Sequence, residues 1–209
     1  MIAIVDYGVG NLFSLESSFK AIGQQAVVTG DPAVLAKADG IILPGVGAFR
    51  DASEKLRATG LDSVLKDLCA AGKPLMGICL GMQMLFEKSL EYGEYEGLGL
   101  IPGTVRPLHD VIDPALKIPH IGWNALQFVR SSPLFSHIQN GDHVYFVHSY
   151  WADTPDENRV ANTEYSCPIT AAVQRGNVMG CQFHPEKSGD TGLKILTAFC
   201  EICGKGENA

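Results

Sequence analysis

The sequence predicts an α/β fold: an open, mostly parallel, twisted sheet flanked by helices on both faces, with an antiparallel extension in the second half. Two observations favour this architecture. Short apolar runs alternate with longer segments of helical spacing up to about residue 80, a rhythm typical of βαβ units. Strand-like runs then predominate, and one pair is joined by the turn signal Gly176-Asn177, which favours an antiparallel hairpin.

In the first half, four apolar runs are expected to form parallel strands, because continuous apolar strands are typical of sheets that are covered on both faces. These runs are Ile2–Val5, Ala26–Thr29, Gly40–Leu43 and Leu75–Ile78. Apolar residues recur at helical spacing between them, over residues 13–22 and 49–71. Helices are therefore expected in both of these segments.

In the second half, strands are expected over residues 99–108, 118–129, 144–151, 169–175 and 178–183. The last two form the hairpin around Gly176-Asn177, and a helix over about residues 192–203 closes the fold. We find no composition break, repeat or low-complexity tract that would mark a linker. A single domain over residues 1–209 is therefore expected.

The composition excludes several function classes. Sixteen Lys and Arg against 23 Asp and Glu give a net charge of −7, and no basic cluster could follow a phosphate backbone, so no nucleic-acid partner is expected. The N-terminal segment lacks the basic region of a signal peptide, and no apolar run approaches eighteen residues. These patterns predict a cytoplasmic protein without a membrane partner.

The six cysteines are expected to be free thiols, because nothing indicates an oxidising compartment. Cys200 and Cys203 have CxxC spacing, but no second pair completes a zinc site. No metal and no cofactor are expected.

The sharpest local signal is Gly77-Ile78-Cys79-Leu80-Gly81, between a predicted strand and a helical pattern. Glycines two residues on either side allow the sharp turn that presents a nucleophile above a sheet. A helix N-terminus or a neighbouring imidazolium would favour the reactive thiolate form of Cys79. The alternative is that Cys79 is a small buried side chain, as most unpaired cysteines are.

A base for this thiol is offered by His184-Pro185-Glu186, which follows the last predicted strand. Pro185 favours an extended conformation at His184, which places His184 and Glu186 on the same side of the chain. A carboxylate in that position can orient the imidazole and support its charged form. The alternative is a histidine that ends a strand beside a solvated glutamate.

A third element is Pro44-Gly45-Val46-Gly47, which follows a buried strand. Its backbone N–H groups could stabilise an oxyanion at the same sheet edge. The alternative is a plain glycine-rich turn, and the segment lacks the residues of a phosphate-binding loop.

Together these segments resemble the class I glutamine amidotransferases. The nucleophile segment 77–83 and the His-Pro-Glu segment match the two motifs of that family. The resemblance extends from residue 6 to residue 188 and is closest to the glutaminase subunits of histidine biosynthesis. It is carried by Asp6-Tyr7-Gly8-Val9-Gly10-Asn11-Leu12, Leu43-Pro44-Gly45-Val46-Gly47-Ala48-Phe49, Pro119-His120-Ile121-Gly122-Trp123-Asn124, Tyr145-Phe146-Val147-His148-Ser149-Tyr150 and His184-Pro185-Glu186-Lys187-Ser188.

The resemblance implies roles for individual residues, which are written here as expectations. Cys79, His184 and Glu186 would form the triad that hydrolyses the side-chain amide of glutamine. The backbone N–H of Leu80, with one from Gly45 or Val46, would hold the oxyanion. The remaining substrate contacts would come from Gly47, Gln83 and the backbone of Ser149 and Tyr150, whereas the side chain of His148 is expected to be structural.

The resemblance also implies a partner, a (β/α)₈-barrel cyclase subunit that receives the ammonia and makes imidazole glycerol phosphate and aminoimidazole carboxamide ribotide. The docking face would include Asn11, Trp123, Asn124, Tyr145 and Lys187. Core packing is the alternative for Trp123 and Tyr145, and a solvated charge for Lys187. The isolated chain is expected to be weakly active.

Two other functions stay open on the sequence. The same triad could feed anthranilate, aminodeoxychorismate, purine or pyridoxal phosphate synthesis, although the segment 121–124 argues against these. The chain could also be a non-catalytic relative on the same fold whose Cys79 senses oxidants.

Overall fold

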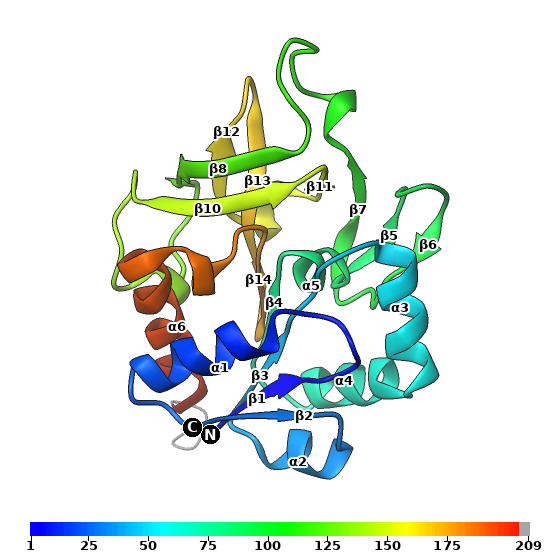
Figure 1. The fold of residues 1–209 in the computed structure, drawn as a ribbon, viewed down its shortest axis with the longest axis vertical. Helices are drawn as coiled ribbons and strands as arrows, with labels where there is room; N and C mark the ends of the chain where they lie inside the picture. Colours follow the sequence, from blue (N-terminus) through cyan, green and yellow to red (C-terminus); the bar gives the residue numbers. More distant parts are fainter. Residues whose placement is uncertain (205–209) are drawn as a thin grey trace.

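The main sheet within residues 1–204, the part that this computed structural model describes, has eight strands in the order β2-β1-β3-β4-β14-β13-β12-β9 (Figure 1). Its first five strands are parallel. They are β1 (Ile2–Val5), β2 (Ala26–Thr29), β3 (Gly40–Leu43), β4 (Leu75–Ile78) and β14 (Val178–Cys181). The four parallel strands expected in the first half are all confirmed.

The sheet continues as an antiparallel extension through β13 (Pro168–Arg175), β12 (Arg159–Glu164) and β9 (Gln127–Phe128). The predicted hairpin is confirmed, because β13 pairs antiparallel with β14 across Gly176-Asn177. A mostly parallel sheet with an antiparallel extension is therefore the observed architecture.

Two smaller sheets lie beside the carboxyl ends of the parallel strands (Figure 1). One consists of β8 (His120–Ala125) and β10 (His143–His148), paired antiparallel. The other has the order β11-β7-β5-β6, with bounds Tyr150–Asp153, Ile101–Pro107, Phe86–Ser89 and Tyr95–Glu96. Short 3-10 helices connect these parts, at Leu108–Asp110 (η1), Pro133–Phe135 (η2), Asp156–Asn158 (η3) and Pro185–Lys187 (η4).

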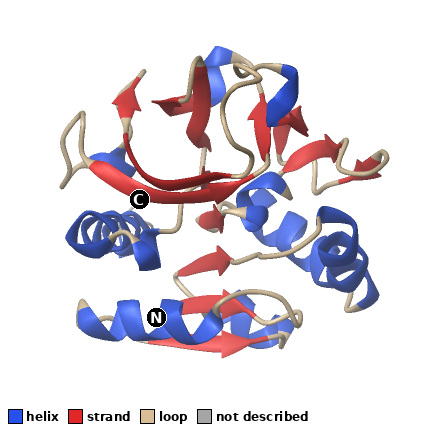
Figure 2. Ribbon diagram, turned by 45° about the horizontal axis from the view of Figure 1, so that its top comes forward, coloured by secondary structure: helices blue, strands red, loops and turns tan. Residues whose placement is uncertain are grey.

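Helices cover both faces of the main sheet, as Figure 2 shows. On one face, α1 (Leu12–Ala21) and α6 (Gly189–Gly204) pack against Ile2 and Ile4. On the other face, α2 (Pro32–Lys37), α3 (Phe49–Ala58) and α4 (Leu61–Ala70) pack against Ala3 and Val5. Alternate residues of one strand thus point into two separate hydrophobic cores, which explains its continuous apolar sequence.

Four sequence-based expectations were wrong in detail. The segment 49–71 is two helices, because the chain turns at Gly60, whose φ is +71°. The segment 144–151 is two strands in different sheets, separated by Ser149, and the segment 118–129 is divided in the same way at Leu126. The helix after Cys79, α5, has only four residues (Leu80–Gln83), and the chain then enters β5.

Several elements were not predicted. The helix α2 begins with Pro32, and the preceding Asp31 is its N-cap, because the Asp31 side chain accepts a hydrogen bond from the Ala33 N–H. This helix was missed because its six residues are too few to show a clear helical periodicity. The strands β5, β6 and β12 were missed because polar residues interrupt their apolar patterns. Within residues 1–204, no helix combines the length and the apolar character required to span a membrane.

Candidate active site

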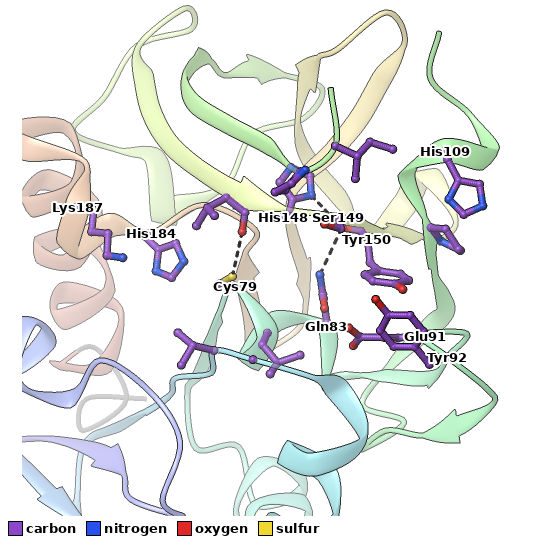
Figure 3. A pocket seen from close by; sticks show the side chains of 17 residues that line it. Cys79, Gln83, Glu91, Tyr92, His109, His148, Ser149, Tyr150, His184 and Lys187 are labelled. Carbon is purple, nitrogen blue, oxygen red and sulfur yellow. Dashed lines mark hydrogen bonds between the residues drawn. The ribbon is translucent and has the colours of Figure 1, made fainter. Parts of the chain in front are cut away.

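Cys79 lies at the carboxyl end of β4, between this strand and α5. Its φ is 55° and its ψ is −112°, a backbone conformation that residues with a side chain rarely adopt. The Cys79 N–H donates to the carbonyl of Cys181 at 2.7 Å, which ties the turn to the neighbouring strand β14. The turn presents the thiol to a cavity of about 570 Å³ (Figure 3).

The glycines around Cys79 are required by close backbone contacts. A Cβ on Gly81 would lie 1.9 Å from the Leu43 carbonyl oxygen, and one on Gly77 would lie 2.5 Å from the Gly81 carbonyl oxygen. These distances leave no room for a side chain. The sharp turn that the Gly-x-Cys-x-Gly pattern predicts is therefore present.

His184 and Glu186 meet at the end of β14, where η4 begins. His184 Nδ1 lies 2.8 Å from Glu186 Oε1, and the two side chains are 3% and 1% exposed. Glu186 Oε2 is also buried and has no hydrogen-bond partner within residues 1–204. The carboxylate is therefore directed at the imidazole, as expected, although it reaches the ring from the first turn of η4 and not from an extended segment.

The electrostatics of His184 favour its charged form. Burial alone would lower the pKa of His184, but the Cys79 sulfur and the Glu186 carboxylate outweigh burial and raise this pKa to about 9. The Cys79 thiol therefore lines the same cavity as an imidazole that holds its proton at neutral pH. An imidazolium beside a thiol favours the nucleophilic thiolate.

The loop 44–47 lies against the start of α5, since a Cβ on Gly45 would be 2.9 Å from Leu80 Cβ. Leu80, Val46 and Gly47 all line the cavity. Within the described chain the N–H groups of Leu80 and Val46 make no hydrogen bond to another protein atom. Neither of the two expected oxyanion donors is therefore engaged by another group of the described chain.

Gln83 and Gln182 connect the thiol to the cavity wall. Gln83 Nε2 donates to Gln182 Oε1 at 3.0 Å and to the Tyr150 carbonyl at 3.3 Å. Gln182 is completely buried, and its Nε2 lies 3.9 Å from Cys79 Sγ. The sequence interpretation missed Gln182, although its place directly after the buried strand β14 and two residues before His184 could have indicated it.

Ser149 and Tyr150 line the cavity opposite α5. The Ser149 carbonyl accepts the Leu108 N–H at 2.9 Å, and the Tyr150 carbonyl accepts both Gln83 Nε2 and His148 Nδ1, the latter at 2.8 Å. Figure 3 shows Gln83 and His148 bonded to this carbonyl. The imidazole of His148 is thus a support for the cavity wall, as expected.

Glu91 is a second residue that the sequence interpretation missed. Its carboxylate lies in the same cavity, on the far side of Gln83 from Cys79 (Figure 3). It accepts the Phe49 N–H at 2.7 Å, and burial raises its pKa. Because Glu91 stands among several surface acids in the sequence, nothing distinguished it before the fold brought it to the cavity.

The five residues expected on a docking face differ in their exposure and in the direction of their side chains. Trp123 is 55% exposed and packs edge-on against Tyr145, its partner across β8 and β10. Lys187 is exposed at the cavity, and Asn11 is half-buried at the start of α1. The Asn124 amide, in contrast, points inward and bonds to His120 and to the Glu164 carbonyl.

The cysteines do not pair with one another, and the described part of the chain shows no metal-ligating cluster. All six cysteines are unpaired thiols. Within residues 1–204, no three His, Cys, Asp or Glu side chains are grouped as metal ligands would be.

The fold and this site match one protein family. The profile of the family "Glutamine amidotransferase class-I" matches residues 3–202, so the chain belongs to the class I glutamine amidotransferases. Within that family it is similar to proteins named imidazole glycerol phosphate synthase subunit HisH. The relative from Bacillus cereus is 50% identical over 199 residues, which are 95% of this chain and 93% of the relative.

Two further relatives with this name give the same result. The subunit from Oceanobacillus iheyensis is 47% identical over 97% of this chain and 99% of its own. The subunit from Listeria monocytogenes is 46% identical over 97% of this chain and 96% of its own. The assignment to an amidotransferase of histidine biosynthesis, made from the motifs, is confirmed.

Solved structures support the fold. A crystal structure described as a glutamine amidotransferase superposes with a TM-score of 0.76 at 18% identity, over 98% of this chain and all of the other. The PurLQS structure from Thermotoga maritima contains a chain with a TM-score of 0.72 at 20% identity, over 96% of this chain and 97% of the other. The α/β architecture is therefore shared well beyond the range of close sequence similarity.

Proposed function

We propose that the chain hydrolyses glutamine to glutamate and ammonia with Cys79 as the nucleophile, and that it passes the ammonia to a (β/α)₈-barrel cyclase subunit. The observation that carries this proposal is the buried His184–Glu186 pair beside the Cys79 thiol. Burying two charged side chains costs free energy even when they pair, and buried pairs with a shifted pKa cluster at functional sites.

The first chemical step is attack of Cys79 Sγ on the carboxamide carbon of glutamine. The carbonyl π electrons move to the oxygen, and the resulting oxyanion accepts hydrogen bonds from the N–H groups of Leu80 and Val46. One such donor contributes about 10²–10³ in rate. His184 holds the proton that the thiol has lost.

His184 then gives this proton to the departing nitrogen, and ammonia leaves as the C–N bond breaks. The glutamyl thioester remains on Cys79. Neutral His184 next takes a proton from water, which attacks the thioester and releases glutamate. Glu186 keeps the imidazole oriented through both steps.

The cavity can hold the amino-acid end of glutamine away from Cys79. Gln83 Oε1 has no partner in the described chain, and the Glu91 carboxylate lies beyond it. Both can accept hydrogen bonds from the α-ammonium group. Gly47 and the backbone around Ser149 and Tyr150 would contact the remaining polar groups.

The cyclase subunit would dock on the outer face of β8 and β10. Four apolar side chains, Ile121, Trp123, Tyr145 and Val147, share this face by strand register, and Ile121 is 58% exposed. An apolar face with two exposed side chains, Ile121 and Trp123, and two half-buried ones is typical of an interface. The Val147 carbonyl lies 4.0 Å from Cys79 Sγ, so a partner on this face would sit next to the source of ammonia. Trp123, Tyr145 and Lys187 are the proposed contacts, with Asn11 at the edge.

A steady-state glutaminase assay tests this proposal, with and without the barrel cyclase and its ligand. We expect weak activity of the isolated chain, strong activity of the complex, and loss of activity in Cys79→Ala. The control Cys167→Ser changes a thiol outside the cavity and should leave the activity intact. Full activity in Cys79→Ala would show that Cys79 is not the nucleophile.

The same assay distinguishes other acceptors of ammonia. The chain is mixed in turn with anthranilate, aminodeoxychorismate, purine and pyridoxal phosphate synthase subunits. Stimulation by one of these and not by the barrel cyclase would contradict the proposed partner.

A further inference from the structure

A directed chain of hydrogen bonds connects the inner side of β8 with the glutamine cavity. Asn124 Nδ2 lies 3.3 Å from His120 Nε2, His120 Nδ1 lies 2.9 Å from His148 Nε2, and His148 Nδ1 lies 2.8 Å from the Tyr150 carbonyl oxygen. None of these four residues belongs to the proposed triad. The direction in which each bond donates follows from the two ends of the chain.

At one end, the backbone fixes the orientation of the Asn124 amide. Asn124 Nδ2 donates to the Glu164 carbonyl at 2.8 Å, and Asn124 Oδ1 accepts the Ala125 N–H at 2.8 Å. A backbone carbonyl only accepts and a backbone N–H only donates. The group that faces His120 is therefore the NH₂ group, and His120 Nε2 must accept from it.

At the other end, the Tyr150 carbonyl requires a proton on His148 Nδ1. His120 Nδ1 and His148 Nε2 face each other, so only one of these two nitrogens can carry a proton. Burial lowers the pKa of His148 to about 3 and also lowers the pKa of His120, so both rings are neutral near pH 7. Each neutral ring then carries its proton on Nδ1, and the two ends of the chain agree.

Packing holds the rings in this arrangement. The His120 ring stacks between Tyr165 and Phe146, with centroid distances of 4.1 and 5.0 Å, and both histidines are buried. The rings therefore have little freedom to rotate away from their partners.

The chain of bonds ends on a group that shapes the glutamine cavity. The Tyr150 carbonyl also accepts Gln83 Nε2, so His148 and Gln83 occupy both of its acceptor positions. We propose that Asn124 is a positioning residue that fixes the tautomers of His120 and His148. Through them it holds Tyr150 and Gln83 in the arrangement that binds glutamine.

This inference rests on the proposed glutaminase function and reassigns one residue of the expected docking face. An interface contact would need a free amide, whereas both ends of the Asn124 amide are already hydrogen-bonded within the chain. The neighbouring Trp123 points to the outer face, as the alternation of a strand requires.

The first experiment is ¹⁵N NMR of the histidine rings in the full chain at pH 7. We expect His120 and His148 to be protonated at Nδ1 and unprotonated at Nε2. This measurement needs no variant, so it stays decisive even if a substitution prevents folding. A proton on Nε2 of either ring in the wild-type chain would overturn the inference.

The second experiment measures glutaminase kinetics of the Asn124→Ala variant in complex with the barrel cyclase. Without this donor the two tautomers are fixed only from the Tyr150 end, so a minor population with the proton on Nε2 should become detectable at His120 and, to a lesser extent, at His148. The KM for glutamine should rise about three- to tenfold, the effect of weakening one hydrogen bond, while kcat stays within about twofold because Cys79 and His184 are untouched.

The matched control is Asn177→Ala. The Asn177 amide also donates to two backbone carbonyls, those of Cys69 and Lys73, but it lies at the opposite end of β14 from the site. It should lower stability without changing either tautomer or the KM. An equal rise in the KM of Asn177→Ala would overturn the inference. An unchanged KM in Asn124→Ala, or unchanged tautomers in that variant, would overturn it as well.

The failure of the proposed function would look different. A wild-type complex without glutaminase activity would overturn the function, and the positioning role with it, while both rings could still show Nδ1 protons. Rings protonated at Nε2 in an active complex would overturn only the positioning role.

Discussion

His184 Nδ1 lies 2.8 Å from Oε1 of Glu186, a residue only two positions further along the chain, and both side chains are buried. Within residues 1–204 this imidazole is the only hydrogen-bond partner of the carboxylate. The pair therefore depends on mutual contact for its stabilisation, and its ionisation and the activity should change together.

Glu186→Gln should lower kcat by about 10²- to 10⁴-fold, because an amide supports neither the charge nor the orientation of His184. The pKa of His184, about 9 in the native chain, should fall in this variant. NMR titration of the ring and glutaminase assays of the complex measure both effects. Glu201→Gln is the control, since Glu201 pairs with His137 at the surface at 2.9 Å. A native His184 that titrates at or below pH 6.5 would contradict this prediction.

The stability of the chain should depend on pH through the same group. Because the pKa of folded His184 lies above the 6.5 of a free imidazole, the folded chain binds more protons than the unfolded chain between about pH 6.5 and 9. The His184 contribution is therefore complete below pH 6.5 and is lost as the pH rises through 9, by up to roughly 3 kcal/mol. Urea unfolding across this range measures the change. Glu186→Gln should show a shallower decline, and an equal slope in both proteins would count against the assignment.

Tyr7→Phe should weaken the loop that carries the oxyanion donors. The Tyr7 hydroxyl donates to the Pro44 carbonyl at 2.7 Å and is buried. Its loss should reduce the free energy of unfolding by about 1 kcal/mol and lower kcat several-fold. Tyr165→Phe removes a comparable but exposed bond to the Lys117 carbonyl, at 2.8 Å, and should leave kcat unchanged. Equal kinetics in the two variants would show that Tyr7 does not hold the loop.

Gly81→Ala should destabilise the chain by about 3 kcal/mol or more, because its Cβ would collide with the Leu43 carbonyl. Gly204→Ala is the control, since its Cβ meets nothing within 4 Å. Thermal unfolding compares the two variants. A Gly81→Ala chain as stable as the control would mean that the turn at Cys79 tolerates a wider separation from β3.

Trp123→Ala should weaken binding of the barrel cyclase by about 2 kcal/mol or more, as expected for an exposed aromatic anchor. Isothermal titration calorimetry of the complex gives the affinity. Val129→Ala changes another exposed apolar residue, away from the proposed face, and should bind normally. Unchanged affinity in Trp123→Ala would remove this face from the proposed interface.

The sequence was sufficient for the parts of the molecule that depend on local patterns. The parallel strands are continuous apolar runs, and the turn at Cys79 needs glycines at fixed spacing, so both can be found without coordinates. The pairing of His184 with Glu186 was predicted from an extended backbone, but only His184 is extended, and Glu186 reaches the ring from the 3-10 helix η4.

The remaining features depend on contacts between distant segments. Gln182 reaches Cys79 only because β14 pairs with β4, and Glu91 enters the cavity only because β5 turns the chain back towards α3. The separation of β10 from β11 at Ser149 could not be predicted either, because apolar residues continue on both sides of Ser149 in the sequence. Asn124 could not be separated from Trp123 until the two faces of β8 were known.

The backbone of Cys79 has a consequence for evolution and design. At φ 55° a side chain is strained by roughly 1–3 kcal/mol, which a glycine would not suffer. Cys79→Gly should therefore yield an inactive protein that is more stable than the active one. Selection for thermal robustness alone would discard this thiol, so catalysis and stability compete at a single position of the chain.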